Sequence, residues 1–160
     1  MIQLHPRKTL PHLVSLLVLA LLAAIIFVRP VAAEPSETDE KAAAVAAMEK
    51  WMKLIDEGNY AQSWKEASAA FQKALTEEQW AAASRAVREP LGTCKDRTLA
   101  SVLIQNEIPA PGGEMLKGTF AIAQFKSSFE NLFQAVETVT FEREKDGEWR
   151  ASGYFIKPEV

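Results

Sequence analysis

Histidine is missing from residues 34–160, because both histidines of the chain, His5 and His12, stand near its N-terminus. A domain without histidine cannot activate a serine or cysteine nucleophile through an imidazole, and it lacks the commonest ligand of zinc. Cysteine occurs once, at Cys94, so no disulfide can form within the chain. These absences exclude the common histidine-based hydrolase mechanisms. They also lead us to expect neither a metal site nor a bound cofactor.

Positive charge is scarce once the N-terminal region is set aside. Removal of residues 1–33 takes away Arg7, Lys8 and Arg29 and no acidic residue, which leaves 15 Lys and Arg against 21 Asp and Glu, a formal charge of −6. Nucleic-acid binding needs a basic face, so we expect no nucleic-acid partner. The remaining 127 residues suffice for a single domain that buries about two thirds of the surface of its unfolded chain.

The longest apolar run lies near the N-terminus, over residues 13–28. It follows the basic pair Arg7 and Lys8 and precedes the small residues Ala32 and Ala33, which is the pattern of a secretory signal peptide. We therefore expect a signal peptide over residues 1–33, cleavage after Ala33, and export to the periplasm or the medium. An uncleaved anchor is the alternative, in which residues 13–28 alone hold the protein in the membrane.

The exported part divides into a helical half and a strand half. Residues 34–41 are acidic and almost free of apolar groups, which predicts a flexible linker before a single domain over residues 42–158. A 3.6-residue periodicity predicts three helices. They run from Ser36 or Thr38 to Glu57, over residues 60–75, and from Thr76 to the residues before Pro90. Their expected buried residues are Val45, Met48, Trp51, Met52, Leu54 and Ile55; Tyr60, Trp64, Ala67, Phe71 and Leu75; and Trp80, Ala83 and Val87.

Alternation of apolar and polar residues replaces the helical period after Gly92. It predicts four strands, with a hairpin turn at Asp146-Gly147 and a loop over residues 108–113. The strands are expected at residues 96–106, 117–127, 131–144 and 148–157. The order predicts an α+β fold in which three N-terminal helices pack on one face of a curved four-stranded antiparallel sheet.

Several short motifs give this order of elements a family resemblance. They are Asp56-Glu57-Gly58-Asn59-Tyr60, Ser63-Trp64, Arg88-Glu-Pro-Leu-Gly92, Arg97, Glu137-Thr-Val139, Trp149-Arg150 and Gly153-Tyr154. Over about residues 42–157 the chain resembles the bacterial domain of unknown function 4019 family, within the nuclear transport factor 2-like (cystatin-like) fold. The resemblance implies a cone-shaped domain in a bacterial exported protein. It implies no activity, because none is assigned to that family.

Glu137 is the first candidate for chemistry, since it shares one face of its strand with Phe133, Ala135, Val139 and Phe141. A carboxylate on an apolar face must be paired or must keep its proton. One hypothesis is a pocket acid with a raised pKa. The favoured alternative is a structural ion pair with Arg97 or Arg88.

The other candidates cluster around the end of the third helix and the first strand. A basic group of Arg85, Arg88, Lys95 and Arg97 suggests a site for a carboxylate or phosphate, or else ordinary surface charge. Arg88 and Arg97 from this group, together with Tyr154 on the last predicted strand, are the candidate ligand-binding residues.

Two further features offer less specific hypotheses. Asp56 with Tyr60 is a candidate acid–base pair, although Asp56 reads more simply as a solvated residue at a helix end. Cys94 is expected to be an idle thiol, with an intermolecular disulfide as the alternative.

Two functional hypotheses follow. The favoured one is a non-catalytic envelope or periplasmic module that binds a small ligand or an envelope protein. The alternative is a small acid–base enzyme of the isomerase, dehydratase or hydrolase type that uses Glu137 or Asp56 in a cavity. The two hypotheses differ in one structural requirement: only the enzyme needs a cavity beside an unpaired carboxylate.

Overall fold

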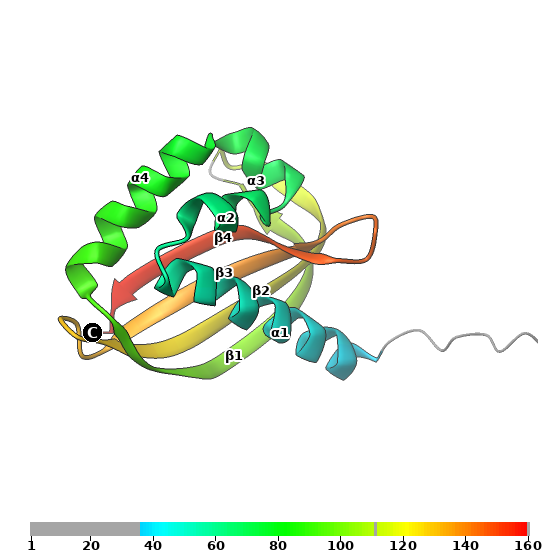
Figure 1. Ribbon diagram of the computed structural model, residues 1–160. Helices are drawn as coiled ribbons and strands as arrows, with labels where there is room; N and C mark the ends of the chain where they lie inside the picture. Colours follow the sequence, from blue (N-terminus) through cyan, green and yellow to red (C-terminus); the bar gives the residue numbers. More distant parts are fainter. Residues whose placement is uncertain (1–35, 111, 160) are drawn as a thin grey trace, which may run out of the picture. The chain divides into compact units, whose positions relative to one another are not determined.

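The computed structural model describes residues 36–110 and 112–159, which contain helices followed by an antiparallel sheet (Figure 1). The predicted signal peptide, its cleavage site at Ala33 and the apolar segment 13–28 lie outside these residues. Among the described helices, none is long and apolar enough to cross a membrane. The elements are α1 (Glu37–Asp56), α2 (Tyr60–Lys65), α3 (Ala69–Ala74), α4 (Glu77–Arg88), the 3-10 turn η1 (Glu89–Leu91), β1 (Cys94–Pro109), β2 (Met115–Phe129), β3 (Ala135–Arg143) and β4 (Trp149–Pro158).

Helix α1 begins after Ser36, one of the two N-caps predicted for it, and therefore earlier than a domain boundary at residue 42 implies. The side chain of Ser36 accepts from the backbone N–H of Asp39, and Asp39 reaches back to Ser36, so the two form a capping box. Lys41 also pairs with Glu37 at 2.6 Å, one helical turn away. The acidic segment expected as a flexible linker is therefore helical from Glu37, because its polar residues cap and pair along the first turns.

The second predicted helix is in fact two short helices, α2 and α3. Ser68 interrupts it by acting as the N-cap of α3, where its side chain accepts from the N–H of Phe71. The Ser68 N–H donates to the carbonyl of Ala151 at 2.8 Å, and Ala67 forms a parallel bridge to the same residue of β4. The prediction of one continuous helix was wrong because this backbone segment bonds to the sheet.

Helix α4 buries Trp80 as predicted, but the rest of its buried row lies on a different side from the predicted one. The capping box of Thr76 and Gln79 is present. The buried row is Trp80, Ser84 and Arg88, however, and the predicted Ala83 and Val87 face solvent, with Val87 46% exposed. The helical periodicity predicted burial of the apolar Ala83 and Val87. The side of α4 that carries Arg88 faces the core instead, because Arg88 contacts Asp56 and Phe129 there.

The sheet has the strand order β1-β2-β3-β4 with antiparallel neighbours, as predicted. Strands β1 and β2 run further than expected, to Pro109 and from Met115, so the predicted loop between them is shorter. The Asp146-Gly147 turn is present between β3 and β4, where Gly147 has φ +86°. Phe133 was wrongly placed on the buried face of the third strand: it precedes β3 and is 84% exposed.

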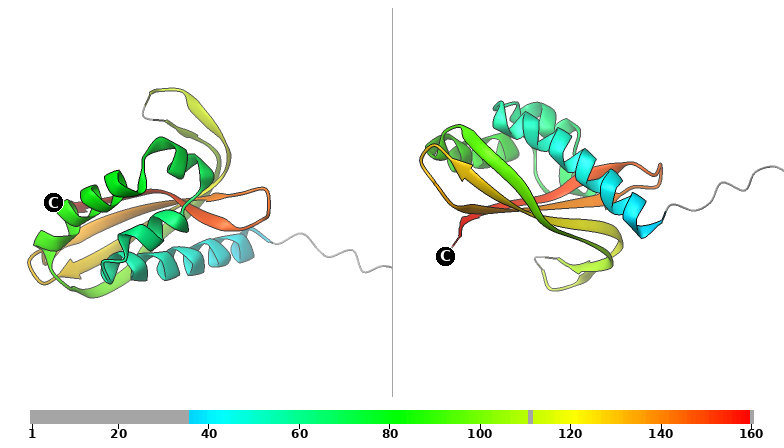
Figure 2. Two further views of the ribbon diagram at one scale, coloured as in Figure 1. Left: turned by 45° about the horizontal axis from the view of Figure 1, so that its top comes forward. Right: turned by 90° about the horizontal axis from the view of Figure 1, so that it is seen from below.

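The core lies between the helices and one face of the sheet (Figure 2). Along β3 the buried positions alternate strictly, at Ala135, Glu137, Val139 and Phe141. Trp51 lies at the centre, with its ring centroid 5.9 Å from those of Trp80 and Tyr154 and 6.0 Å from that of Phe141. Trp51 and Trp80 are buried, as predicted, and Trp64 and Trp149 pack at the edge of the core.

Candidate functional site

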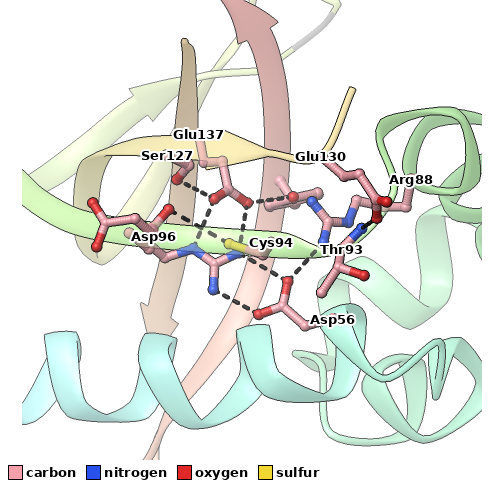
Figure 3. A network of polar contacts seen from close by, with 10 residues as sticks. Asp56, Arg88, Thr93, Cys94, Asp96, Ser127, Glu130 and Glu137 are labelled. Carbon is pink, nitrogen blue, oxygen red and sulfur yellow. Dashed lines mark hydrogen bonds and ion pairs between the residues drawn. The ribbon is translucent and has the colours of Figure 1, made fainter. Parts of the chain in front are cut away.

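Glu137 lies on the buried face of β3 with no exposed surface, and its two oxygens accept from four donors (Figure 3). Arg97 Nε donates to Oε1 at 2.7 Å, and Arg97 Nη2 donates to Oε2 at 3.2 Å. The Ser127 hydroxyl also donates to Oε1, and the Tyr154 hydroxyl donates to Oε2 at 2.5 Å. The expected ion pair between Glu137 and Arg97 is present. A bidentate pair with two added hydroxyl donors satisfies a buried carboxylate.

Arg97 joins Glu137 to a second carboxylate, that of Asp56. Its Nη1 donates to Asp56 Oδ2 at 2.7 Å and its Nη2 donates to Oδ1 at 2.9 Å. Burial by itself would lower the pKa of Arg97, but its hydrogen bonds to Asp56 and Glu137 outweigh burial and raise that pKa above its ordinary value. Arg97 therefore stays charged.

Arg88 reaches the same acid from helix α4. Its Nη2 donates to Asp56 Oδ1 at 2.7 Å, and its guanidinium carbon lies 4.4 Å from the centroid of the Phe129 ring. Only 4% of the side chain is exposed. Its Nε and Nη1 atoms are buried and have no hydrogen-bond partner among the described residues. The interpretation of Asp56 as a solvated helix-end residue is wrong, since two arginines hold its carboxylate.

These four charged residues form one network, which we call the buried ion-pair network: Asp56, Arg88, Arg97 and Glu137, with Ser127 and Tyr154 as neutral donors. Two carboxylates and two guanidiniums make it formally neutral. Its members come from α1, α4 and all four strands. Sequence reasoning missed Ser127, whose only sequence clue is that it is a polar residue in the buried alternation of β2.

Tyr154 serves the network as a protonated donor. Burial and the negative charge of Glu137 raise the pKa of Tyr154 well above its ordinary value. Its phenol therefore keeps its proton at neutral pH and donates it to Glu137. Tyr154 and Arg97, two of the expected ligand-binding residues, are both engaged within the network.

A cavity of about 390 Å³ opens where α1 and α4 end and α2 begins, near the start of β1. Asp56, Tyr60, Arg88 and Thr93 are among its lining residues, and Glu137, Arg97 and Tyr154 are not. Tyr60 is buried, and this burial raises its pKa. The structure thus brings Asp56, Tyr60 and Arg88 together at the cavity and places Glu137 apart from it.

The basic group expected around Arg88 is matched by carboxylates. Arg85 pairs with Glu89 at 3.2 Å and Lys95 pairs with Glu130 at 3.8 Å, both near the surface. The group is therefore not a bare cationic face.

Two further kinds of site, a reactive thiol and a metal centre, depend on Cys94 and on the acidic residues. Burial raises the pKa of the Cys94 thiol, which keeps it protonated at neutral pH. Within the described ranges, no group of three or more Cys, Asp or Glu side chains is placed to hold a metal ion.

A comparison with protein families bears on the same residues. The model of a family described as "Protein of unknown function (DUF4019)" matches residues 47–154. The match begins within α1 and ends at Tyr154, so it contains every member of the buried ion-pair network. No curated protein matches the chain.

Proposed function

The chain belongs to the DUF4019 family of proteins of unknown function, and we propose that its domain works outside the cytoplasm as a non-catalytic module that binds a small polar ligand. One observation carries the proposal. Arg88, at the wall of the cavity, has two buried nitrogen atoms without a hydrogen-bond partner among the described residues. Buried donors of this kind are rare in folded proteins, and a ligand in the cavity supplies the missing partner once the Arg88 side chain turns these closed-off atoms toward it.

The pairing of both candidate acids favours binding over catalysis. A general base needs a free lone pair beside its substrate, and a general acid needs a proton to give. Glu137 accepts from four donors outside the cavity, and Asp56 accepts from two arginines. The alternative of an acid–base enzyme that uses Glu137 or Asp56 therefore has no specific observation in its favour.

The charges around the cavity indicate the class of ligand. Its volume falls in the range of small-molecule sites, about 300–1,000 Å³. Arg85 and Arg88 line it together with four acids, Asp56, Glu57, Glu89 and Glu130. A simple anion would meet more negative than positive charge there. A zwitterion, such as an amino acid or a short peptide, can place its carboxylate near Arg88 and its ammonium near an acid.

The location outside the cytoplasm is proposed from the leader. Residues 1–33 combine a basic start, an apolar stretch and small residues before Glu34. Expression of the full-length chain in a bacterium, followed by N-terminal sequencing of the periplasmic fraction, tests this directly. A product that begins at Glu34 supports export. A full-length product in the cytoplasm overturns it.

Binding is tested by calorimetry with amino acids and dipeptides, and with acetate and methylamine as single-charge controls. We expect heat of binding only with molecules that carry both charges. Arg88→Lys keeps a cation for Asp56 but removes the unpartnered donors, so it should abolish binding and leave the fold intact. Arg150→Ala is the matched control, because Arg150 pairs with Asp146 away from the cavity. No binding by any zwitterion, or equal binding by Arg88→Lys, would refute this site.

A further inference from the structure

The sheet splits at one end, because β2 and β3 part there. The pairing of β2 with β3 begins at Thr119 and Arg143, so residues 115–118 of β2 lie beside β1 alone. The register of β1 with β2 shifts at the same place, between Gln105 and Glu107. A bulge of this kind bends the strands that carry it. Figure 2 (left) shows the β1–β2 hairpin rising away from the β3–β4 hairpin.

A groove of about 580 Å³ lies where the two hairpins part. Lys117 and Gly118 line it from β2. Residues 142–146, at the end of β3 and in the turn that follows, line it as well, and so do Ala69 and Ala70 of α3. The groove shares no lining residue with the cavity of about 390 Å³, so it is a separate site.

The edge of β2 that borders this groove carries backbone groups without a strand partner. Every second residue of a strand turns its N–H and C=O toward the same neighbouring strand. Along residues 115–118 the groups on the β3 side meet no strand within the described ranges, because β3 pairs with β2 only from Thr119 onward. A free strand edge is a template for another extended chain. Four residues of strand span about 13 Å, the length of a short peptide segment.

Most of the charged side chains along the groove already have a partner. Arg150 pairs with Glu144 at 2.7 Å and with Asp146 at 2.8 Å. Arg143 pairs with Glu40 at 2.6 Å. Recognition of a charged ligand therefore falls to the remaining charges.

Two lysines and one glutamate remain. Lys117 and Lys145 line the groove from β2 and from the β3–β4 turn, and neither has an ion pair in the part of the chain that the structure describes. Glu142 is partly buried and has no ion pair among these residues either. Burial and the neighbouring Glu144 raise the pKa of Glu142, so it takes up a proton more readily beside an approaching carboxylate. The charges left over in the groove favour an acidic ligand.

We propose that this groove binds an extended acidic peptide, which adds as a strand to residues 115–118 in the place that β3 leaves open. The backbone of the peptide pairs with the free edge of β2, and its carboxylates meet Lys117 and Lys145. Strand addition takes its affinity from main-chain hydrogen bonds and its specificity from side chains. The partner is therefore a protein with an exposed, extended acidic segment.

Peptide binding tests both parts of the proposal. The full-length protein, in the form that the host produces, is titrated into a labelled, capped hexapeptide in which threonine and glutamate alternate. One control peptide replaces each glutamate by lysine. The other keeps the glutamates and carries N-methyl groups on its backbone amides, which removes the donors that a strand needs. We expect fluorescence anisotropy to show binding of the first peptide only.

Charge reversal tests the two lysines. Lys117→Glu combined with Lys145→Glu should raise the Kd of the acidic peptide about ten-fold or more. Lys157→Glu is the matched control and should leave the Kd unchanged, because Lys157 is an exposed strand lysine at the opposite end of the sheet. Arg88→Lys should also leave it unchanged, since Arg88 lines the other cavity. Failure of the groove and failure of the cavity as a ligand site are therefore distinguishable.

Hydrogen exchange locates the bound peptide. Amide exchange over residues 115–118 should slow when the acidic peptide is saturating, because the free edge gains partners. Four results would each overturn the proposal: no binding of the acidic peptide, equal binding of either control peptide, an unchanged Kd in the double variant, or no added protection over residues 115–118.

Discussion

Replacing Glu137 by glutamine is the sharpest test of how this domain is held together. The substitution keeps the size of the side chain and removes its charge. Four donors converge on the two oxygens of Glu137, from Arg97, Ser127 and Tyr154. An amide offers one oxygen in place of two, and its NH2 group must face either Arg97, which cannot accept from it, or a hydroxyl that has to turn from donor to acceptor. Arg97 then keeps only Asp56 as its counter-ion.

The expected loss of stability is large. Removing one partner of a buried ion pair costs about 3–5 kcal/mol, because the other charge stays buried without compensation. The second carboxylate, Asp56, still neutralises part of the charge of Arg97, which places the effect at the lower end, near 3 kcal/mol. A domain of this kind has about 5–15 kcal/mol in total, so a single atom exchange would remove a large fraction of it.

Urea unfolding followed by tryptophan fluorescence measures the effect, because Trp51 and Trp80 lie in the core. With an m value of about 1–3 kcal/mol per M, the midpoint should fall by roughly 1–3 M at unchanged m. The matched control is Glu107→Gln, the same substitution at an exposed position of β1, where a change within about 0.5 kcal/mol is expected.

Equal stability of Glu137→Gln and its control would refute the reasoning, since a satisfied buried charge cannot be removed without cost. A gain in stability would refute it in the other direction. It would mean that the desolvation of Glu137 and Arg97 outweighs their attraction.

Three further outcomes follow from the same contacts. The pKa of Asp146 is lowered to about 2, chiefly by its hydrogen bond with Arg150. The contribution of Asp146 to stability is therefore present above its ordinary pKa of 3.8 and is lost as the pH falls through about 2. The difference in urea midpoint between the wild type and Asp146→Asn should vanish over that pH range. The pKa of Tyr154 is raised by burial and by Glu137, so its stabilising contribution is present below pH 10.0 and declines above it, and ultraviolet titration should show less tyrosinate at pH 11 in the native protein than in the unfolded chain. Cys94, whose thiol pKa is raised by burial, should react with a disulfide reagent at pH 7 more slowly than a cysteine in a short peptide, and equal rates would contradict its burial.

The class of the fold was predictable because its information is local. Alternation along β3 placed Glu137 on the buried face, and the Asp146-Gly147 pair set the hairpin turn. The capping box at Thr76 fixed the start of α4. These features depend on residues a few positions apart, so the sequence contains all that is needed to find them.

Three of the errors share one cause, which is that a partner far away in the sequence decided the outcome. The break at Ser68 depends on a hydrogen bond to Ala151, more than eighty positions away in the chain. The inward turn of Arg88 depends on Asp56 and Phe129. The sequence pointed to Arg97 or Arg88 as partner of Glu137, but it could not show that Asp56 joins them, because a helix-end aspartate usually faces water.

Asp56 belongs to the buried ion-pair network and also lines the cavity, so its ion pair with Arg88 limits how a ligand can bind there. A ligand that competed with Asp56 for Arg88 would have to break a charge-assisted hydrogen bond of 2.7 Å to a buried guanidinium. A ligand that accepts from Nε or Nη1 can leave that bond in place, because Arg88 uses Nη2 for Asp56, although the side chain must first turn these buried atoms toward the cavity. The second mode keeps the ion pair and satisfies donors that are already desolvated. Binding through it should therefore add to the stability of the domain, by an amount that rises with ligand concentration above its Kd.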